Sequence, residues 1–191
     1  MASTVISRRV FALRVAAIPM ALGATDWGFA APGPMEPYAA SGASGVSHAA
    51  AAIRQEVLLD AGRHRVYQAL TTAERFDKVV RLSAAAAFAT MPDAPPTQIA
   101  PIEGGAFALF GGYVTGQQVE LVPDERIVQV WRARSWEPGA YSVARFVLKD
   151  EGTKTRLVLD HKGFPDDQAT HLADGWQVNY WQPLAQYLSQ G

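Results

Sequence analysis

Tight-turn signals divide residues 103–162 into five short segments, and this division constrains the fold more than any other feature of the chain. The turns are predicted at Gly111-Gly112 and at residues 123–126, 137–140 and 150–154. The segments between them alternate apolar and polar residues, which is typical of half-buried strands. Strands joined by such short turns pair antiparallel. The sequence therefore predicts an antiparallel meander of five strands, preceded by a separate strand over residues 53–61.

One long helix is predicted over residues 167–189, after the last strand. Its apolar stripe repeats every three or four residues, as on the buried face of a helix. The stripe consists of Leu172, Trp176, Tyr180, Leu184 and Tyr187. The sheet offers the only apolar face large enough to cover this stripe, so we expect the helix to lie across the sheet.

Pro183 falls inside this predicted helix, on the margin of its polar face. A proline in a helix interior removes one backbone hydrogen bond and bends the helix. We therefore expect a kink near residues 179–183, with the backbone carbonyl of Asn179 free to bind water.

The segment between the first strand and the meander is predicted to be partly helical. Helical spacing indicates a helix that begins after Gly62 and a second short helix that ends near Val80, with Thr71 or Thr72 as the cap between them. Residues 81–101 contain four prolines, which neither a helix interior nor a central strand accepts. We expect an irregular excursion there.

The first 52 residues differ in composition from the rest. Arg8-Arg9 precedes Phe11, a weakly apolar run covers residues 15–24, and the small residues Gly28 and Ala30 follow. This order is that of a secretory signal and resembles a twin-arginine (Tat) signal, although the later basic residue, Arg14, stands one place late. The prediction is a Tat signal over residues 1–31, a flexible linker over 32–52 and a domain over 53–190. The alternative is an alanine-rich tail on a cytoplasmic protein.

Composition and motif spacing exclude several classes of function. A net charge of −1 argues against a nucleic-acid surface. The chain has no cysteine, and its apolar run at 15–24 is about half the ~20 residues that span a bilayer, so no stable membrane anchor is expected. The glycines of "GGYVTG" lack the Gly-Lys-Ser/Thr ending of a phosphate loop, which favours a structural hairpin. The histidines have no zinc-site spacing. No catalytic residue, metal or cofactor is therefore predicted.

Aromatic and isolated polar residues of the predicted sheet and helix are the candidates for lining a cavity. His161 shares a strand face with Leu157 and Leu159, and Arg145 lies between two valines. Each has an ordinary alternative, as a hydrogen-bonded core histidine or as a surface arginine. The candidate ligand-binding residues are Phe107, Tyr113, Trp131, Arg145, His161, Trp176 and Tyr180.

Several motifs resemble one known family. They are "GYVTG" at 112–116, "PDERIV" at 123–128 with Trp131, and "GFP" at 163–165 followed by Gly175-Trp176. In order and spacing they are similar to the family of homologues of the activator of the Hsp90 ATPase, in the START-like (SRPBCC) superfamily. The resemblance covers residues 53–190. It implies an α+β helix-grip fold (START/Bet v 1-like), in which a curved antiparallel sheet wraps around a long C-terminal helix and leaves a cavity between them.

Three functions remain open at this point. The preferred one is non-enzymatic binding of a small hydrophobic molecule, lipid-like or aromatic, in that cavity. The family name implies the second, stimulation of the Hsp90 ATPase by protein contact, which requires a cytoplasmic location rather than the expected periplasmic or secreted one. The third, by analogy with related folds, is a cyclase or dehydratase that uses His161, Arg145 and Tyr113 as acid or base.

Overall fold

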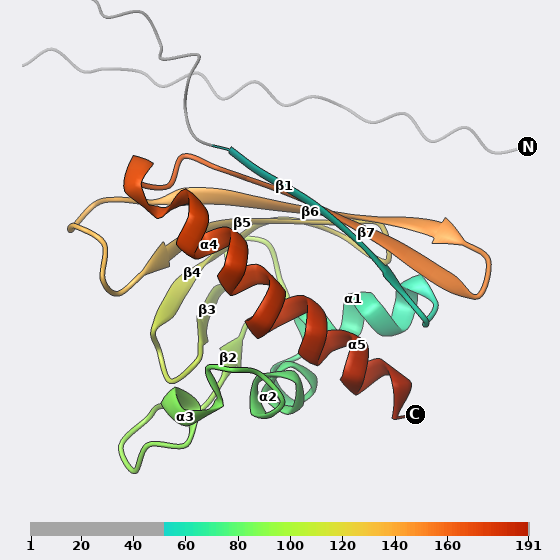
Figure 1. Ribbon diagram of the computed structural model, residues 1–191, viewed down its shortest axis with the longest axis horizontal. Helices are drawn as coiled ribbons and strands as arrows, with labels where there is room; N and C mark the ends of the chain where they lie inside the picture. The colour runs from blue at the N-terminus through green and yellow to red at the C-terminus, as the bar shows by residue number, and fades with distance from the viewer. Residues whose placement is uncertain (1–51, 191) are drawn as a thin grey trace, which may run out of the picture. The chain divides into compact units, whose positions relative to one another are not determined.

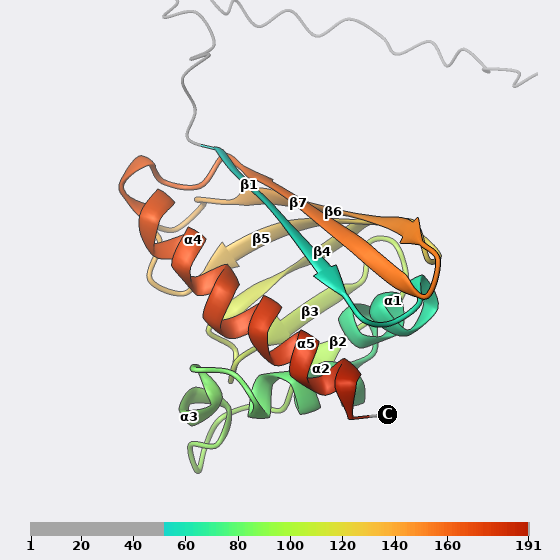
Figure 2. The ribbon, with the colours of Figure 1, turned by 45° about the vertical axis from the view of Figure 1, so that its right-hand side comes forward.

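The computed structural model describes residues 52–190. The predicted export signal and the predicted linker up to residue 51 lie outside the described residues. Within them, one antiparallel sheet curves around one long C-terminal helix, as Figures 1 and 2 show from two directions. This arrangement is the expected helix-grip fold.

The sheet has seven strands in the order β1-β7-β6-β5-β4-β3-β2, and every neighbouring pair is antiparallel. The predicted five-strand meander is confirmed as β3 to β7, with β1 added beside β7. The strands are β1 (Ala52–Leu59), β2 (Gln98–Ile99), β3 (Ala106–Leu109), β4 (Val114–Val122), β5 (Arg126–Ala133), β6 (Ser142–Glu151) and β7 (Lys154–Lys162).

Alternation along the strands determines which face of the sheet is buried. Every second residue of β5 is buried, from Ile127 to Ala133, and the residues between them are half-buried. A register shift between Gln118 and Glu120 leaves Val119 as an extra residue of β4. Such a bulge bends a strand and increases its twist, which contributes to the concave shape of the sheet.

The hairpin between β3 and β4 differs from the prediction. The loop has four residues, not two, because Leu109 still pairs with Val114. Three consecutive residues, Phe110, Gly111 and Gly112, have positive φ. Glycine adopts a positive φ at little energetic cost, so Gly111 and Gly112 are not strained. The backbone conformation of Phe110 is less favourable and is stabilised by burial of its side chain in the core. The hairpin itself, predicted in preference to a phosphate loop, is confirmed.

Helices α1 (Arg63–Thr71) and α2 (Ala73–Arg81) cover one end of the concave face. Thr72 separates them as expected, but its side chain makes no capping hydrogen bond, so the predicted capping interaction is wrong. The proline-containing stretch that follows is largely irregular. It contains only one helical turn, α3 (Ala86–Ala89), and the two residues of β2.

The C-terminal helix consists of α4 (Ala169–Trp176), a π-helical segment (Gln177–Trp181) and α5 (Gln182–Ser189), after a 3₁₀ turn at Asp166–Gln168. Five of its buried positions form a stripe at steps of four residues: Leu172, Trp176, Tyr180, Leu184 and Leu188. A regular α-helix rotates such a stripe by about 40° per step. The wider π turn in the middle offsets this rotation, so the stripe continues to face the sheet.

The π-helical segment lies immediately before Pro183. The N–H of Gln182 bonds to the carbonyl of Gln177, and in that register Pro183 cannot supply the next bond, to the carbonyl of Val178. The backbone N–H of Ala84 supplies it at 3.3 Å. Pro183 is buried, not on the margin of the polar face. The carbonyl that it frees is that of Val178 and not that of Asn179, and it bonds to the backbone of Ala84. The predicted position of Pro183 and the predicted free carbonyl are therefore both wrong.

Candidate functional site

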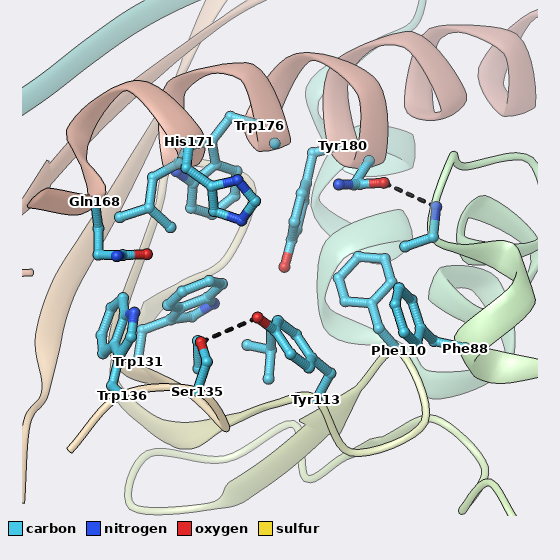
Figure 3. Close-up of a pocket in the computed structure, with 16 residues that line it drawn as sticks. Phe88, Phe110, Tyr113, Trp131, Ser135, Trp136, Gln168, His171, Trp176 and Tyr180 are labelled. Atoms are coloured by element: carbon cyan, nitrogen blue, oxygen red, sulfur yellow. Dashed lines mark hydrogen bonds between the residues drawn. The ribbon is translucent and has the colours of Figure 1, made fainter.

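A cavity of about 230 Å³ lies between the C-terminal helix and the sheet, close to the loop that joins β3 and β4 (Figure 3). The helix contributes Trp176 and Tyr180, and β5 contributes Trp131. The wall is mostly apolar, with aromatic rings on several sides. Among the described residues, no Lys, Arg, Asp or Glu side chain lines this cavity. It therefore suits a neutral, compact and largely apolar molecule.

The aromatic rings of the wall are packed against one another. Trp176 and Tyr180 lie 4.2 Å apart by ring centroids, Tyr180 lies 5.4 Å from Phe110, and Trp131 lies 5.6 Å from Trp136. These separations and tilts are those that aromatic pairs prefer. The cavity wall is thus part of the hydrophobic core, and its shape is set by the same contacts that stabilise the fold.

Two buried polar atoms in this wall have no hydrogen-bond partner among the described residues. They are the indole Nε1 of Trp131 and the hydroxyl of Tyr180. Burial raises the pKa of Tyr180 well above its usual range, and the neighbouring Trp131 indole opposes that rise only in part. The Tyr180 hydroxyl therefore stays protonated, and both groups can donate a hydrogen bond.

His161 lies behind this wall in a complete hydrogen-bond chain. The indole Nε1 of Trp176 donates to Nδ1 of His161 at 3.1 Å, which requires the ring proton to be on Nε2. Nε2 then donates to the hydroxyl of Ser142 at 2.7 Å, and that hydroxyl donates to the carbonyl of Trp131 at 3.1 Å. The chain holds a neutral imidazole, and burial lowers the pKa of His161 to about 4.

The rim of the cavity includes the only helical turn of the irregular segment. Phe88 of α3 is 52% exposed and stacks on Tyr113 at 5.9 Å, and the Tyr113 hydroxyl bonds to Ser135 at 3.1 Å. The start of this segment is fixed to the π-helical part of the C-terminal helix, where the side-chain oxygen of Asn179 accepts a hydrogen bond from the backbone N–H of Ala85 at 2.9 Å. The π segment thus positions one side of the cavity entrance.

The model of the family described as "Activator of Hsp90 ATPase homolog 1-like protein" matches residues 60–189. The chain belongs to this family. Human activator of 90 kDa heat shock protein ATPase homolog 1 is 29% identical over 96 residues, which are 50% of this chain and 28% of the human protein. The chain therefore corresponds to less than a third of that relative.

Solved structures of similar proteins agree with the fold of this chain. PFC0360w, an Hsp90 activator from Plasmodium falciparum, superposes with a TM-score of 0.63 at 20% identity, over 72% of this chain and 96% of that one. CalU16 from Micromonospora echinospora gives a TM-score of 0.56 at 22% identity, over 72% of this chain and 76% of that one. At these identities the likeness shows the fold alone.

Four of the seven residues predicted to line a cavity in this family member do so: Tyr113, Trp131, Trp176 and Tyr180. The other three lie elsewhere. His161 is enclosed by Trp131, Trp176 and Phe164. Phe107 is buried beside Gly116, at the other end of β3 from the cavity. That any of the seven binds a ligand stays a prediction.

Arg145 lies on the outer face of the sheet, because buried residues alternate along β6 and Arg145 occupies an exposed position. It forms a long ion pair with Asp160, at 3.8 Å, and Arg54 bonds to the same carboxyl group at 2.7 Å. The ordinary interpretation of Arg145 as a surface residue therefore describes its position. Of the three residues considered as acid or base, only Tyr113 reaches the cavity wall.

Several wall residues were missed from the sequence: Phe88, Phe110, Ser135, Trp136, Gln168 and His171. Phe110 and Trp136 are the last residues of predicted strand segments, and an aromatic residue at a strand end is a usable signal. Phe88 lies in an irregular alanine-rich stretch, and nothing in its local pattern indicates that it returns to the sheet.

The part of the chain from residue 52 to residue 190 contains no helix long and apolar enough to cross a membrane. In the same residues, no group of three or more His, Asp or Glu side chains is arranged to hold a metal ion.

Proposed function

We propose that the domain binds a compact, neutral, largely apolar small molecule in the cavity between the sheet and the C-terminal helix. The single observation that carries the proposal is the aromatic-walled cavity, with its two buried polar groups that lack partners. A native core rarely leaves such groups unpaired without a functional reason. The volume of about 230 Å³ lies below the range of roughly 300–1,000 Å³ for drug-sized ligands, so a ring-sized molecule fits better than a long-chain lipid.

Filling the cavity from Gly175 tests this proposal. Gly175 belongs to α4 and lines the cavity, and a Cβ there would meet only Asn179 Nδ2, at 3.8 Å. We expect Gly175→Leu to place its side chain in free space and to abolish uptake of ring-sized compounds, while the domain stays folded. Uptake is measured by NMR titration of the full-length protein with indole and with acetophenone.

Ala185→Leu is the matched control, because it enlarges an exposed residue of α5 outside the cavity wall. It should leave the titrations unchanged. Equal uptake by wild type and Gly175→Leu would place the binding elsewhere, and no uptake of any compound by the wild type would overturn the proposal.

A second candidate function is stimulation of the ATPase of an Hsp90-type chaperone by protein contact. The family and the name of the human relative favour it, although the chain corresponds to only 28% of that relative. This function also requires that the protein share a compartment with the chaperone and ATP, which the proposed export through the Arg8-Arg9 signal would prevent.

One pair of measurements separates the two functions. If the binding proposal holds, we expect the full-length protein in the periplasmic or secreted fraction, a shift to the cytoplasm on changing Arg8 and Arg9 to Lys, and no effect of the purified protein on the ATPase rate of Hsp90. Cytoplasmic location of the wild type together with a raised ATPase rate would support the co-chaperone instead.

A further inference from the structure

Two buried hydrogen-bond donors without partners lie in the cavity wall, and among residues 52–190 no Lys, Arg, Asp or Glu side chain lines it. In Figure 3 the ring of Tyr180 descends from the helix with its hydroxyl toward the opposite wall, where Trp131 rises from β5. Trp131 is 5% exposed and Tyr180 is 6% exposed, and neither Nε1 nor the hydroxyl has a partner among the residues that the structure describes. The two donors lie near each other, because the Trp131 indole acts on the Tyr180 hydroxyl, so one acceptor atom can reach both.

We propose that the cavity selects neutral, ring-sized compounds that carry a carbonyl oxygen, and that this oxygen accepts hydrogen bonds from Nε1 of Trp131 and from the hydroxyl of Tyr180. This inference rests on the proposed binding function and names its ligand class. A carbonyl oxygen has two lone pairs and no hydrogen to donate, so it satisfies an indole N–H and a phenol O–H together. Both donor atoms are buried within the wall, so the binding that we propose requires the rings of Tyr180 and Trp131 to turn toward the ligand.

The absence of Lys and Arg from the described wall disfavours the nearest alternative, a carboxylate ligand. A buried carboxylate needs a cation or several donors to replace its hydration. Among residues 52–190, no Arg or Lys side chain lines the cavity. An aldehyde, ketone, ester or amide loses far less hydration on entry, and two donors suffice for it.

The volume of the cavity and the aromatic side chains of its wall determine the size and the apolar part of the proposed ligand. About 230 Å³ corresponds to seven or eight waters at roughly 30 Å³ each in the liquid, which leaves room for one aromatic ring and a short substituent. The rings of Phe110 and Trp136 offer faces and edges on which such a ring packs. Acetophenone has this size and carries one carbonyl group.

Acetophenone and α-methylstyrene are the probes for the test, because they differ only in a carbonyl oxygen against a methylene group. In NMR titrations of the full-length protein, we expect acetophenone to bind about thirtyfold more tightly, since the two hydrogen bonds contribute roughly 1 kcal/mol each. The Trp131 indole N–H resonance, identified by its loss in Trp131→Phe, should shift with acetophenone and not with α-methylstyrene.

Tyr180→Phe should weaken acetophenone binding roughly three- to tenfold and leave α-methylstyrene binding unchanged. Its thermal unfolding temperature should not fall, because the hydroxyl that it removes has no partner to lose. Tyr187→Phe is the matched control: it removes a tyrosine hydroxyl from the same C-terminal helix, outside the cavity wall, so the preference for acetophenone should persist.

The binding function and the preference for a carbonyl group are overturned by different results. If neither probe binds the wild type, the binding function itself is overturned. If both probes bind equally, or if Tyr180→Phe keeps the full preference for acetophenone, the carbonyl inference is overturned while the cavity remains a binding site. Should Tyr180→Phe not fold, the Trp131 indole shift in the wild type decides the question by itself.

Discussion

Replacing Gly116 by alanine is expected to lower the free energy of unfolding by roughly 3 kcal/mol or more. Gly116 lies in β4, between β3 and β5, where it pairs with Phe107 and Trp131. A Cβ at this position would fall well inside contact distance of the Val130 carbonyl oxygen and of the Phe107 ring. The carbonyl belongs to the sheet backbone and cannot turn aside, so the strand itself has to move.

Gly175→Ala provides the matched control, because it adds the same methyl group in open space. Gly175 lies in α4, and the nearest atom to its added Cβ is 3.8 Å away. An interior helical glycine costs about 1 kcal/mol relative to alanine, so this variant should be up to that much more stable. Urea unfolding of the two variants measures both effects. A Gly116→Ala variant within 1 kcal/mol of wild type would show that β4 shifts freely and would contradict the prediction.

The stability of the domain should fall as the pH falls from about 6.5 to about 4, through His161. Its folded-state pKa is lowered to about 4 by burial, against 6.5 in the unfolded chain. Below pH 6.5 the unfolded state therefore binds a proton that the folded state does not, and acid favours unfolding. The loss amounts to about 2 kcal/mol between pH 8 and pH 5, and approaches about 3 kcal/mol below pH 4.

The physical cause is the closed environment of the imidazole. Its two nitrogens are occupied by Trp176 and Ser142, and its ring is enclosed by Trp131 and Phe164 at centroid distances of 5.3 and 5.1 Å. Protonation of Nδ1 would place a second donor against the Trp176 N–H and break the hydrogen-bond chain.

His161→Gln should be less stable at pH 8 and should lose about 2 kcal/mol less than wild type between pH 8 and pH 5. His171→Gln, which changes an exposed histidine of the same domain, should keep the wild-type slope. An NMR titration gives a second measurement that does not depend on folding of the variant: the His161 ring resonances should not titrate above pH 5. A native pKa near 6.5 would contradict the prediction.

The order of the elements could be predicted because it depends on local patterns. The five strands of the meander follow from alternation between turn residues, and the C-terminal helix follows from Leu172, Trp176, Tyr180 and Leu184 at four-residue steps. Resemblance to the Hsp90-ATPase-activator homologues agreed with that order, and the family match confirms it.

The details of the turn and of the helix depend on interactions that a local pattern does not contain. A Gly-Gly pair predicts a two-residue loop, but burial of Phe110 with a positive φ extends it to four. Pro183 predicts a disturbed helix. The disturbance takes the form of a π-helical segment for two reasons that involve residues distant in the chain. The apolar stripe of the helix has to remain packed on the sheet, and the free carbonyl of Val178 accepts a hydrogen bond from the N–H of Ala84.

The sequence by itself determined the fold class and the aromatic character of the region between sheet and helix, because these depend on periodicity and composition. The tertiary structure alone decided which polar groups face the cavity. His161 and Tyr180 both look like polar groups on apolar faces, yet the first is satisfied by Ser142 and Trp176 and the second is left unpaired beside Trp131. That difference arises from hydrogen-bond partners distant in the chain, which the local sequence pattern does not contain.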